Sequence, residues 1–382
     1  MAINTRSPFF YSHTAEDLNQ VSSSLNILIW KGASNPTPAE SPQYQLIKKA
    51  VNTGDKVWFE VSELIRDYIE TEFSGDYYSE PVWFYLYSRP VYEDGTFGVA
   101  EFSVKLAYDS YSYFEEPDFD IDNESILMTN RQVYALADNF FRVPINTKTN
   151  PTITLFKNNE VIFTKTYSSS SLSTGQVKYV SAGGSSVNYD TYKERVLEDG
   201  GTFEDSKCLQ SFFNTFEIGE ADKIQVSDSN GVYFIDVKTI EECKYEPKKV
   251  TFINKFGVLQ DVYFFKKSVE KMNVKKESYK ANILTGGNTY SISDHVNRDF
   301  NVVGKESISL SSGFLSEEYN EVFKQMMLSE KVWITNITDA GEQVLPLNIK
   351  TSNITYKTSL NDRLIEYTIE FDNSFDTINN IR

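Results

Sequence analysis

Apolar and polar residues alternate along many short stretches of this chain, as they do in β-strands that bury one face. The clearest stretch lies near the end, where Ile365, Tyr367, Ile369 and Phe371 alternate with polar residues. Pairing shifted by one residue would expose all four apolar side chains, so the register of this strand is well specified. Further strands are predicted at 57–61, 102–108, 306–310, 331–335, 347–349 and 353–357, and the apolar run 82–87 predicts a buried strand.

Residue pairs that favour tight turns separate several of these strands. Asn158-Asn159 and Asn230-Gly231 each lie between two strand-like stretches and therefore predict β-hairpins. Asp94-Gly95 predicts a turn before the strand at 102–108. Gly257 lies between two strands that we predict within residues 250–267.

Two other stretches have the apolar period of a helix. Ser62 precedes the first, at 63–73, and predicts the N-cap of a helix of about three turns. Ser316 precedes the second, whose first turn carries Glu317 and Glu318 and so suits the helix dipole. The apolar stripe of the second helix consists of Leu315, Tyr319, Val322, Phe323, Met326 and Met327.

Together these elements predict a mainly β fold with a few helices, built from β-sandwich or barrel-like domains. A length of 382 residues favours two or three domains. The acidic stretch 115–124, which contains a proline, predicts a linker or a loop between domains. The Ser- and Gly-rich stretch 167–186 predicts a flexible loop or exposed polar strands. We place an N-terminal β domain with one helix at 1–118, a middle β-sandwich or barrel-like domain at 119–249, and a C-terminal β-sheet with one helix at 250–382.

Charge and cysteine content narrow the classes of function. The net charge is −17, which disfavours binding to nucleic acid or to an anionic membrane and favours solubility. No stretch approaches the ~20 apolar residues of a membrane span, and residues 1–13 lack the apolar core of a secretory signal. With only Cys208 and Cys243, we expect no disulfide framework and no zinc site, and folding in a reducing cytosol.

Residues that commonly carry catalysis are scarce. His13 and His295 are the only histidines, neither lies in an HExxH motif, and no GxSxG motif occurs. The glycine doublets form no phosphate-binding motif and are expected in turns. A pair of carboxylates could hydrolyse a glycosidic bond, but the 54 acidic residues do not single out a pair. We therefore nominate no catalytic, cofactor-binding or metal-binding residue, and we expect no cofactor and no enzymatic activity.

Two stretches could bind a ligand. The acidic residues of 115–124 could bind Ca²⁺, although they lack the order of an EF-hand, and a solvated linker is the favoured interpretation. The stretch 108–117 is rich in tyrosine, and exposed aromatic rings can stack on sugars. Core packing or contact between subunits is the favoured interpretation there.

Both ends of the chain resemble virion structural proteins of tailed phages that infect Bacteroidetes-type bacteria. The resemblance rests on INTRSPFF and WFEVSELIRDYIE near the start, and on NKFGVLQDVYFFKKS, ESISLSSGFLSEEYNEVFKQMMLSEKVWI and NITYKTSLNDRLIEYTIEFDNSFDTINNIR near the end. It covers about half of the chain, excluding roughly 119–250, and implies a place in the tail or baseplate without supplying catalytic residues. The order of strands and helix in the C-terminal region is also similar to that of tail-tube domains.

Three classes of function follow. The first is a non-enzymatic scaffold or adaptor of a phage tail or baseplate, assembled in the host cytoplasm from copies of itself and other virion tail proteins. The second is a receptor- or carbohydrate-binding tail protein with a host surface glycan as ligand. The third, a glycosidase or peptidase, has the least support because histidine is nearly absent. Nucleic-acid recognition and membrane insertion are not expected. If the subunit lined a DNA channel, its lumen should be acidic.

Overall fold

The computed structural model describes ten ranges of the chain and shows a mainly β protein. Strands form 52% and helices 7% of it, which confirms the predicted fold class. None of the helices in the described ranges is long and apolar enough to cross a membrane. The ranges are 2–13, 19–31, 41–77, 81–136, 140–167, 177–183, 221–282, 292–338, 341–356 and 364–378.

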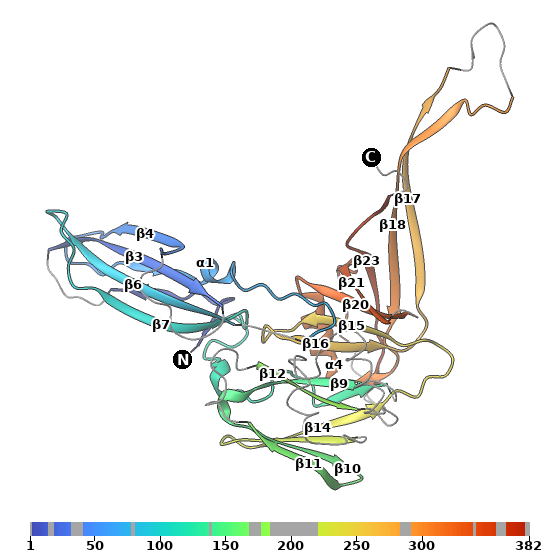
Figure 1. Cartoon of the computed structure of the whole chain (residues 1–382), viewed down its shortest axis with the longest axis horizontal. Coiled ribbons are helices and arrows are strands. Elements are labelled where there is room, and N and C mark those ends of the chain that lie inside the picture. Colours follow the sequence, from blue (N-terminus) through green and yellow to red (C-terminus); the bar gives the residue numbers. More distant parts are fainter. Residues whose placement is uncertain are drawn as a thin grey trace. The chain divides into compact units, whose positions relative to one another are not determined.

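The chain forms two compact units (Figure 1). The first comprises Met1–Glu241, Phe252–Asp261 and Glu321–Ser329, so the chain returns to it twice. The second comprises Glu242–Thr251, Val262–Asn320 and Glu330–Arg382. The three domain boundaries expected from the sequence stay a prediction.

A five-stranded sheet opens the first unit, with strand order β1-β7-β6-β3-β4. A small sheet of β2 and β5, together with α1, packs on one face, because Phe59, Val61 and Ile65 share a buried core with Leu25 and Phe84 of the large sheet. The bounds are β1 Ile3–Asn4, β2 Phe10–Ser12, β3 Gln20–Trp30, β4 Tyr44–Lys49, β5 Trp58–Glu60, α1 Ser62–Arg66, β6 Val82–Tyr92 and β7 Glu101–Tyr108.

Two expectations for this region are wrong. Helix α1 ends at Arg66 instead of extending to residue 73, and the Ser62 hydroxyl donates to Glu60 instead of capping the helix. The run 82–87 is not buried on both sides, since burial alternates along β6 and the described residues form no second core layer on one face of the sheet. The turn at Asp94-Gly95 is confirmed: Gly95 has φ +80° and Asp94 accepts from the backbone N–H of Thr96.

The middle of the first unit is a sandwich of two sheets around one core. The order β11-β10-β13-β14-β8 forms one sheet and β12-β9 the other, and apolar side chains of both meet in the core. Both predicted hairpins are confirmed, at Asn158-Asn159 with positive φ at both residues and at Asn230-Gly231. The bounds are β8 Gln132–Ala135, β9 Phe140–Asn146, β10 Thr152–Lys157, β11 Glu160–Thr166, β12 Val177–Gly183, β13 Lys223–Ser227 and β14 Val232–Thr239, with 3₁₀ turns at Ile121–Asn123 and Thr147–Thr149.

The structure agrees only in part with the expectations for 115–124 and 167–186. Residues 115–124 form an irregular segment whose residues 115–118 are exposed, but Phe119 and Ile121 are buried and Asp120 caps a 3₁₀ turn, so the segment is not solvated throughout. Within 167–186, β12 is a strand that buries Tyr179 and Val180 rather than an exposed polar one. Residues 168–176 and 184–186 lie outside the described residues.

The second unit contains most of an eight-stranded sheet with the order β16-β15-β20-β21-β23-β18-β17, in which β24 also pairs with β18. The final alternating strand is confirmed, although it is broken into β22 and β23: Ile365, Tyr367, Ile369 and Phe371 are all buried. The bounds are β15 Lys248–Ile253, β16 Leu259–Phe264, β17 Val269–Lys280, β18 Asn297–Ser311, β19 Leu315–Ser316, α4 Tyr319–Met327, β20 Val332–Thr338, β21 Gly341–Ile349, β22 Leu364–Ile365, β23 Thr368–Asn373 and β24 Thr377–Ile378.

Three expectations for the C-terminal region are corrected. The strand at 306–310 is the end of the much longer β18, which the pairing with β17 extends. Ser316 does not cap α4, because it pairs with Leu364 as part of β19. Residues 353–356 of the predicted strand 353–357 have no strand pairing and are mostly exposed, since their alternation faces no second layer; Lys357 lies outside the described residues.

Candidate functional site

The two histidines lie in different surroundings and share no site. His13 is only 1% exposed, and its Nδ1 lies 3.0 Å from Ser88 Oγ and 3.7 Å from Glu101 Oε2. A hydrolytic triad needs an accessible serine, and its base must use one ring nitrogen for the serine and the other for the acid. Here Ser88 is fully buried and both partners face the same nitrogen. His295 is exposed in the expected polar loop before β18.

The acidic residues of 115–124 stabilise the fold around them. Asp122 Oδ2 accepts from the backbone N–H of Ala2 at 2.8 Å and pairs with Lys148. Burial and the nearby Glu116 raise the pKa of the Glu124 carboxyl. Among the described residues, no group of three or more His, Cys, Asp or Glu side chains is placed to hold a metal ion.

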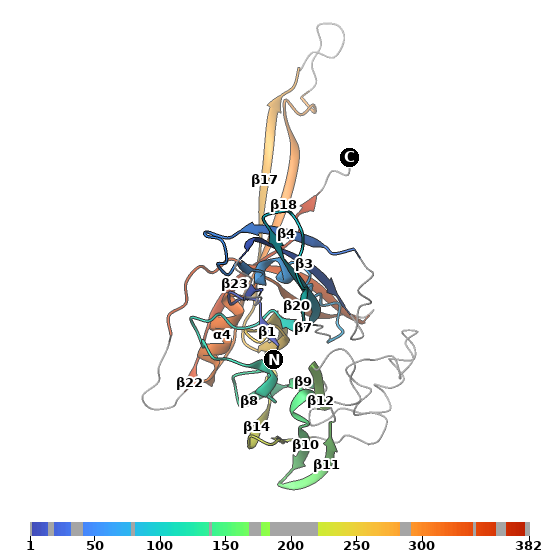
Figure 2. The ribbon, with the colours of Figure 1, turned by 90° about the vertical axis from the view of Figure 1, so that its left-hand side faces the viewer.

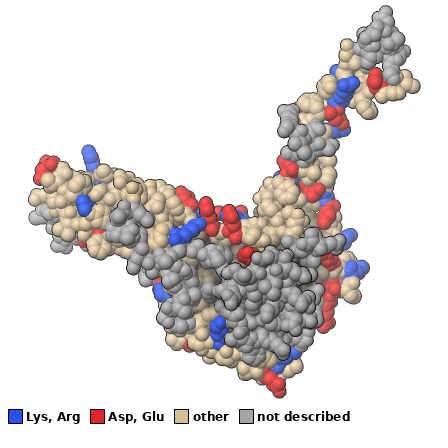
Figure 3. Space-filling view, in the orientation of Figure 1, with Lys and Arg blue, Asp and Glu red and all other residues tan. Residues whose placement is uncertain are grey.

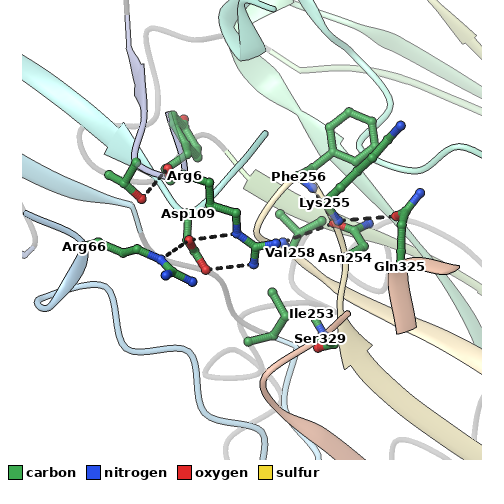
Figure 4. A network of polar contacts seen from close by, with 12 residues as sticks. Arg6, Arg66, Asp109, Ile253, Asn254, Lys255, Phe256, Val258, Gln325 and Ser329 are labelled. Carbon is green, nitrogen blue, oxygen red and sulfur yellow. Dashed lines mark hydrogen bonds and ion pairs between the residues drawn. The ribbon is translucent and has the colours of Figure 1, made fainter. Parts of the chain in front are cut away.

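A partly buried ion-pair network joins the beginning of the chain to the end of β7 (Figure 4). Arg6 contacts both oxygens of the Asp109 carboxylate at 3.0 Å, and Arg66 Nε lies 2.8 Å from Oδ1. Burial alone would raise the pKa of Asp109, but the hydrogen bonds and charges of Arg6 and Arg66 outweigh it and hold the pKa below its usual range. Each charge is paired within the network, so none is left uncompensated in this partly buried position.

Beside this network, the turn between β15 and β16 returns the chain to the first unit. The Asn254 side chain donates to the Leu127 carbonyl at 2.8 Å and accepts from the Phe256 N–H at 2.9 Å. Gly257 has φ +75°, and a Cβ there would lie 2.5 Å from the Asp109 carbonyl oxygen. Only glycine fits this turn against the backbone that follows β7.

One face of the N-terminal sheet carries a row of aromatic side chains, and no core layer covers it within the part of the chain that the structure describes. The Tyr85 ring is nearly parallel to those of Tyr87 and Phe102, at centroid distances of 6.5 and 6.2 Å. The Arg89 guanidinium lies 4.7 Å from the Tyr87 ring centroid. Phe102 is 69% exposed, which is unusual for so large an apolar side chain on a sheet face.

The tyrosine-rich stretch 108–117 is buried in one part and exposed in another. Tyr108 and Tyr111 are buried, and the Tyr111 ring stacks on Phe119 at 3.8 Å, as expected for core residues. Tyr113 and Phe114 are exposed and lie against each other at 4.0 Å. The extended aromatic surface lies on β6 and β7 instead. Its only signal in the sequence is that aromatic residues recur at every second position.

A long two-stranded arm, formed by β17 and β18, is the most prominent feature of the second unit. Figures 1 and 2 show the two strands running together beyond the other strands of the sheet. The other partners of β18 end early, because β23 pairs only with Ser307–Ser311 and β24 only with Val303 and Gly304. All twelve residues of β17 are exposed, including Met272 and Val274 at 55% each and Tyr279.

A groove of about 340 Å³ lies at the base of the arm, on one face of the sheet. Register places its apolar side chains on that face, because Glu270 pairs with Ile308, Met272 with Glu306, and Ile334 with Leu345. The face also presents two carboxylates, Glu270 and Glu306. Lys271 borders the groove too, but alternation along β17 directs its side chain to the opposite face.

A scan against protein-family models and a search of curated proteins both return no match. The resemblance to virion proteins therefore stands on the quoted sequence stretches alone.

We predict that Gly257→Ala destabilises the protein by about 3 kcal/mol or more, since it combines left-handed strain with a backbone clash. Gly95→Ala is the matched control: Gly95 also has positive φ, but a Cβ there meets nothing within 4 Å. The control should lose only about 1 kcal/mol, the cost of the backbone conformation. Urea unfolding of both variants measures the difference, and equal losses would contradict the close approach to Asp109.

The pH dependence of stability should report on His13. Burial lowers its pKa below the ordinary value of 6.5, despite the opposing effect of Glu101. The unfolded chain therefore takes up a proton first, so the contribution of neutral His13 is complete above pH ~6.5 and declines as the pH falls below that value. We expect unfolding midpoints measured between pH 7.5 and 5.5 to fall less steeply for His13→Asn. The exposed control His295→Asn should keep the wild-type slope.

Proposed function

We propose that this protein is a non-enzymatic structural subunit of a phage tail or baseplate, which assembles in multiple copies as a scaffold or adaptor in the virion. This proposal rests on the arm of β17 and β18. Among the described residues, the part of the arm beyond the Val303–Ile378 pair is paired only between β17 and β18, and it exposes apolar side chains on a narrow ribbon. Assembly takes place in the cytoplasm of the bacterial host, with other tail proteins as further partners and without a cofactor.

The physics of a two-stranded ribbon supports this proposal. Such a ribbon is at best marginally stable in water, because it has no second layer to bury its side chains. Covering one half-exposed apolar side chain is worth roughly 1 kcal/mol. Five large apolar side chains along the arm remain partly or largely exposed: Val269, Met272, Val274, Tyr279 and Phe300. A neighbouring subunit that covers them would stabilise the arm and gain affinity from the same contacts.

Other observations agree with a subunit that stays dispersed until it assembles. The net charge of −17 makes free copies repel one another, and lysines on the edge strand β17 discourage uncontrolled strand pairing. The resemblance of both ends of the chain to virion proteins of tailed phages supports a location in the tail or baseplate. Repeated contacts of this kind make an assembly rigid, since many weak interfaces act together.

The direct test is quantitative mass spectrometry of purified particles of the phage that encodes the chain. We expect its peptides at a stoichiometry of several copies per particle, at the level of other tail proteins. Absence from particles that still carry complete tails would end the proposal.

Shortening the arm tests the observation that carries the proposal. Replacing residues 276–302 by Asn-Gly leaves Lys275 and Val303 paired as in the native ribbon, so the remaining sheet keeps its partners. We expect this variant to stay monomeric by native mass spectrometry at concentrations where the full chain forms multimers, with an unchanged far-UV circular dichroism melting curve for the rest of the protein. Multimers of undiminished stability would show that the arm is not needed.

The aromatic face of the N-terminal sheet favours a second candidate function, binding of a host surface glycan. Planar rings stack on the apolar faces of sugars, and Arg89 and Asn26 place donors beside them on the same sheet. The side chains that alternation places on this face of β3, β6 and β7 include no acidic residue between Ser24 and Trp30, between Trp83 and Arg89, or between Phe102 and Leu106.

If this face binds sugars, Tyr87→Ala and Phe102→Ala should each weaken binding about tenfold, the loss of one stacking contact of roughly 1–1.5 kcal/mol. Isothermal titration with neutral oligosaccharides such as cellohexaose and maltohexaose measures the change. Phe114→Ala removes an aromatic ring that is 81% exposed elsewhere and should bind like the wild type. Equal affinity of all three variants would exclude the face as the binding site.

A further inference from the structure

The outer edge of β17 is open along its whole length. Within the part of the chain that the structure describes, β17 pairs with β18 on one side and with no strand on the other. All twelve residues of the strand are exposed. In an antiparallel pair, the backbone N–H and C=O groups of every second residue point away from the partner strand. Such an edge pairs with another strand if the side chains allow it, so the sequence of β17 decides what binds there.

The symmetry of two identical strands limits the ways in which two copies of β17 can pair. In an antiparallel pair with a two-fold axis, directly opposite residues have their side chains on the same face of the sheet. Their backbone groups also point either toward the other strand in both copies or away from it in both. Because both properties alternate along a strand, the axis must pass through a residue, which then lies opposite its own copy.

Charge selects one of these registers. The registers that pair most of β17 have one of its four central residues on the axis: Asn273, Val274, Lys275 or Lys276. An axis at Lys275 or Lys276 places that lysine opposite its own copy. An axis at Asn273 places Lys271 opposite Lys275. Only the axis at Val274 brings no like charges directly opposite each other, because Lys271 then lies opposite Glu277 in both halves of the pair.

The same register also joins apolar side chains of β17. Val269 lies opposite Tyr279 of the second copy at each end of the pair, and Val274 lies opposite its own copy on the axis. All three side chains are exposed on the arm of a single copy. About ten backbone hydrogen bonds form along the paired strands, since opposite residues exchange two bonds at every second position. Pairing in this register therefore covers apolar surface and satisfies backbone groups together.

The other charges of the strand are compatible with this register. Figure 3 shows basic and acidic side chains interspersed along the arm. Lys276 is paired with Asp299 of its own β18 at 2.7 Å and needs no partner in the second copy. Lys275 lies opposite Asn273, and it is diagonal to Lys271 and to its own copy, at ~7–8 Å, where water and salt weaken the repulsion. The directly opposite pairs of unlike charge therefore dominate.

Resting on the proposed function, we propose that two copies of this chain pair edge to edge through β17, antiparallel and with the two-fold axis at Val274. The arms of the two copies then form one four-stranded sheet with the order β18-β17-β17-β18. Such a sheet is more stable than two separate two-stranded ribbons. The lysines of β17 select this register instead of blocking all strand pairing. The contact closes after two copies, so further assembly uses other surfaces of the subunit.

Exchange of charge between Lys271 and Glu277 tests the register. Lys271→Glu and Glu277→Lys each place like charges opposite each other twice, so each should raise the dissociation constant of the dimer about tenfold or more in sedimentation velocity. The double variant restores both pairs with reversed sign and should dimerise like the wild type, as should an equal mixture of the two single variants. The matched control Arg298→Glu, on the neighbouring β18, changes the net charge as much as Lys271→Glu and should keep the wild-type dissociation constant.

A single cysteine on the axis gives an independent measurement. In a chain with Cys208→Ser and Cys243→Ser, Val274→Cys places two thiols directly opposite each other, with Cα atoms about 4.5–5.5 Å apart, within the range of a disulfide. Mild oxidation should then link the dimer covalently, as seen by non-reducing electrophoresis. Lys275→Cys lies opposite Asn273 and should link far less. Preferential linking at position 275 would move the axis and overturn the proposed register.

The remaining outcomes separate this inference from the proposed function. A wild-type chain that stays monomeric at about 0.1 mM overturns the inference, whereas the proposed function stands if purified particles contain several copies. Dimers that both single charge variants leave unchanged show that the copies meet through another surface, and they overturn it too. Lys271 and Glu277 are fully exposed in a single copy, so circular dichroism should show both variants folded. The cysteine measurement decides the register if either variant fails to fold.

Discussion

A β-strand buries a side chain only against a second layer, and this constraint explains both the stable parts of the protein and its exposed arm. In the N-terminal sheet the second layer consists of β2, β5 and α1, and in the middle region the two sheets cover each other. The outer part of β17 and β18 has no such layer among the described residues. Apolar side chains that would form a core elsewhere in the protein therefore stay exposed on the arm.

The ion-pair network at Asp109 shows how the irregular parts of the first unit are held. One partly buried carboxylate accepts from two arginines that lie far apart in sequence, and the backbone of Asp109 packs against Gly257. Removing one partner of a charge that is largely shielded from water usually costs more than the pair contributes in total, because the other charge is left without compensation. The network therefore fixes the geometry of the chain around Asp109.

Patterns that depend on neighbouring residues could be predicted from the sequence, and patterns that depend on tertiary partners could not. The hairpins at Asn158-Asn159 and Asn230-Gly231 follow from local turn chemistry, and the strand ending in Phe371 follows from its alternation. Strand β17 was not predicted, because lysines interrupt its apolar residues and no face is buried. The apolar period after Ser62 predicted too long a helix, since the burial of Phe73 arises beyond the end of α1 rather than on its face. The exposure of the aromatic face could not be predicted either. An apolar run such as 82–87 has the sequence pattern of a buried strand whether or not a second layer covers it.

The parallel pairing of β1 with β7 has a consequence for synthesis of the chain. Ile3 lies beside Ala107, and Arg6 reaches Asp109, so these residues are translated about a hundred residues before their partners. Closing so long a loop is slow compared with forming the hairpin of β6 and β7. Strand β1 must therefore wait, unpaired with its sheet, until β7 has been translated, and Arg6 can join the network at Asp109 only after that.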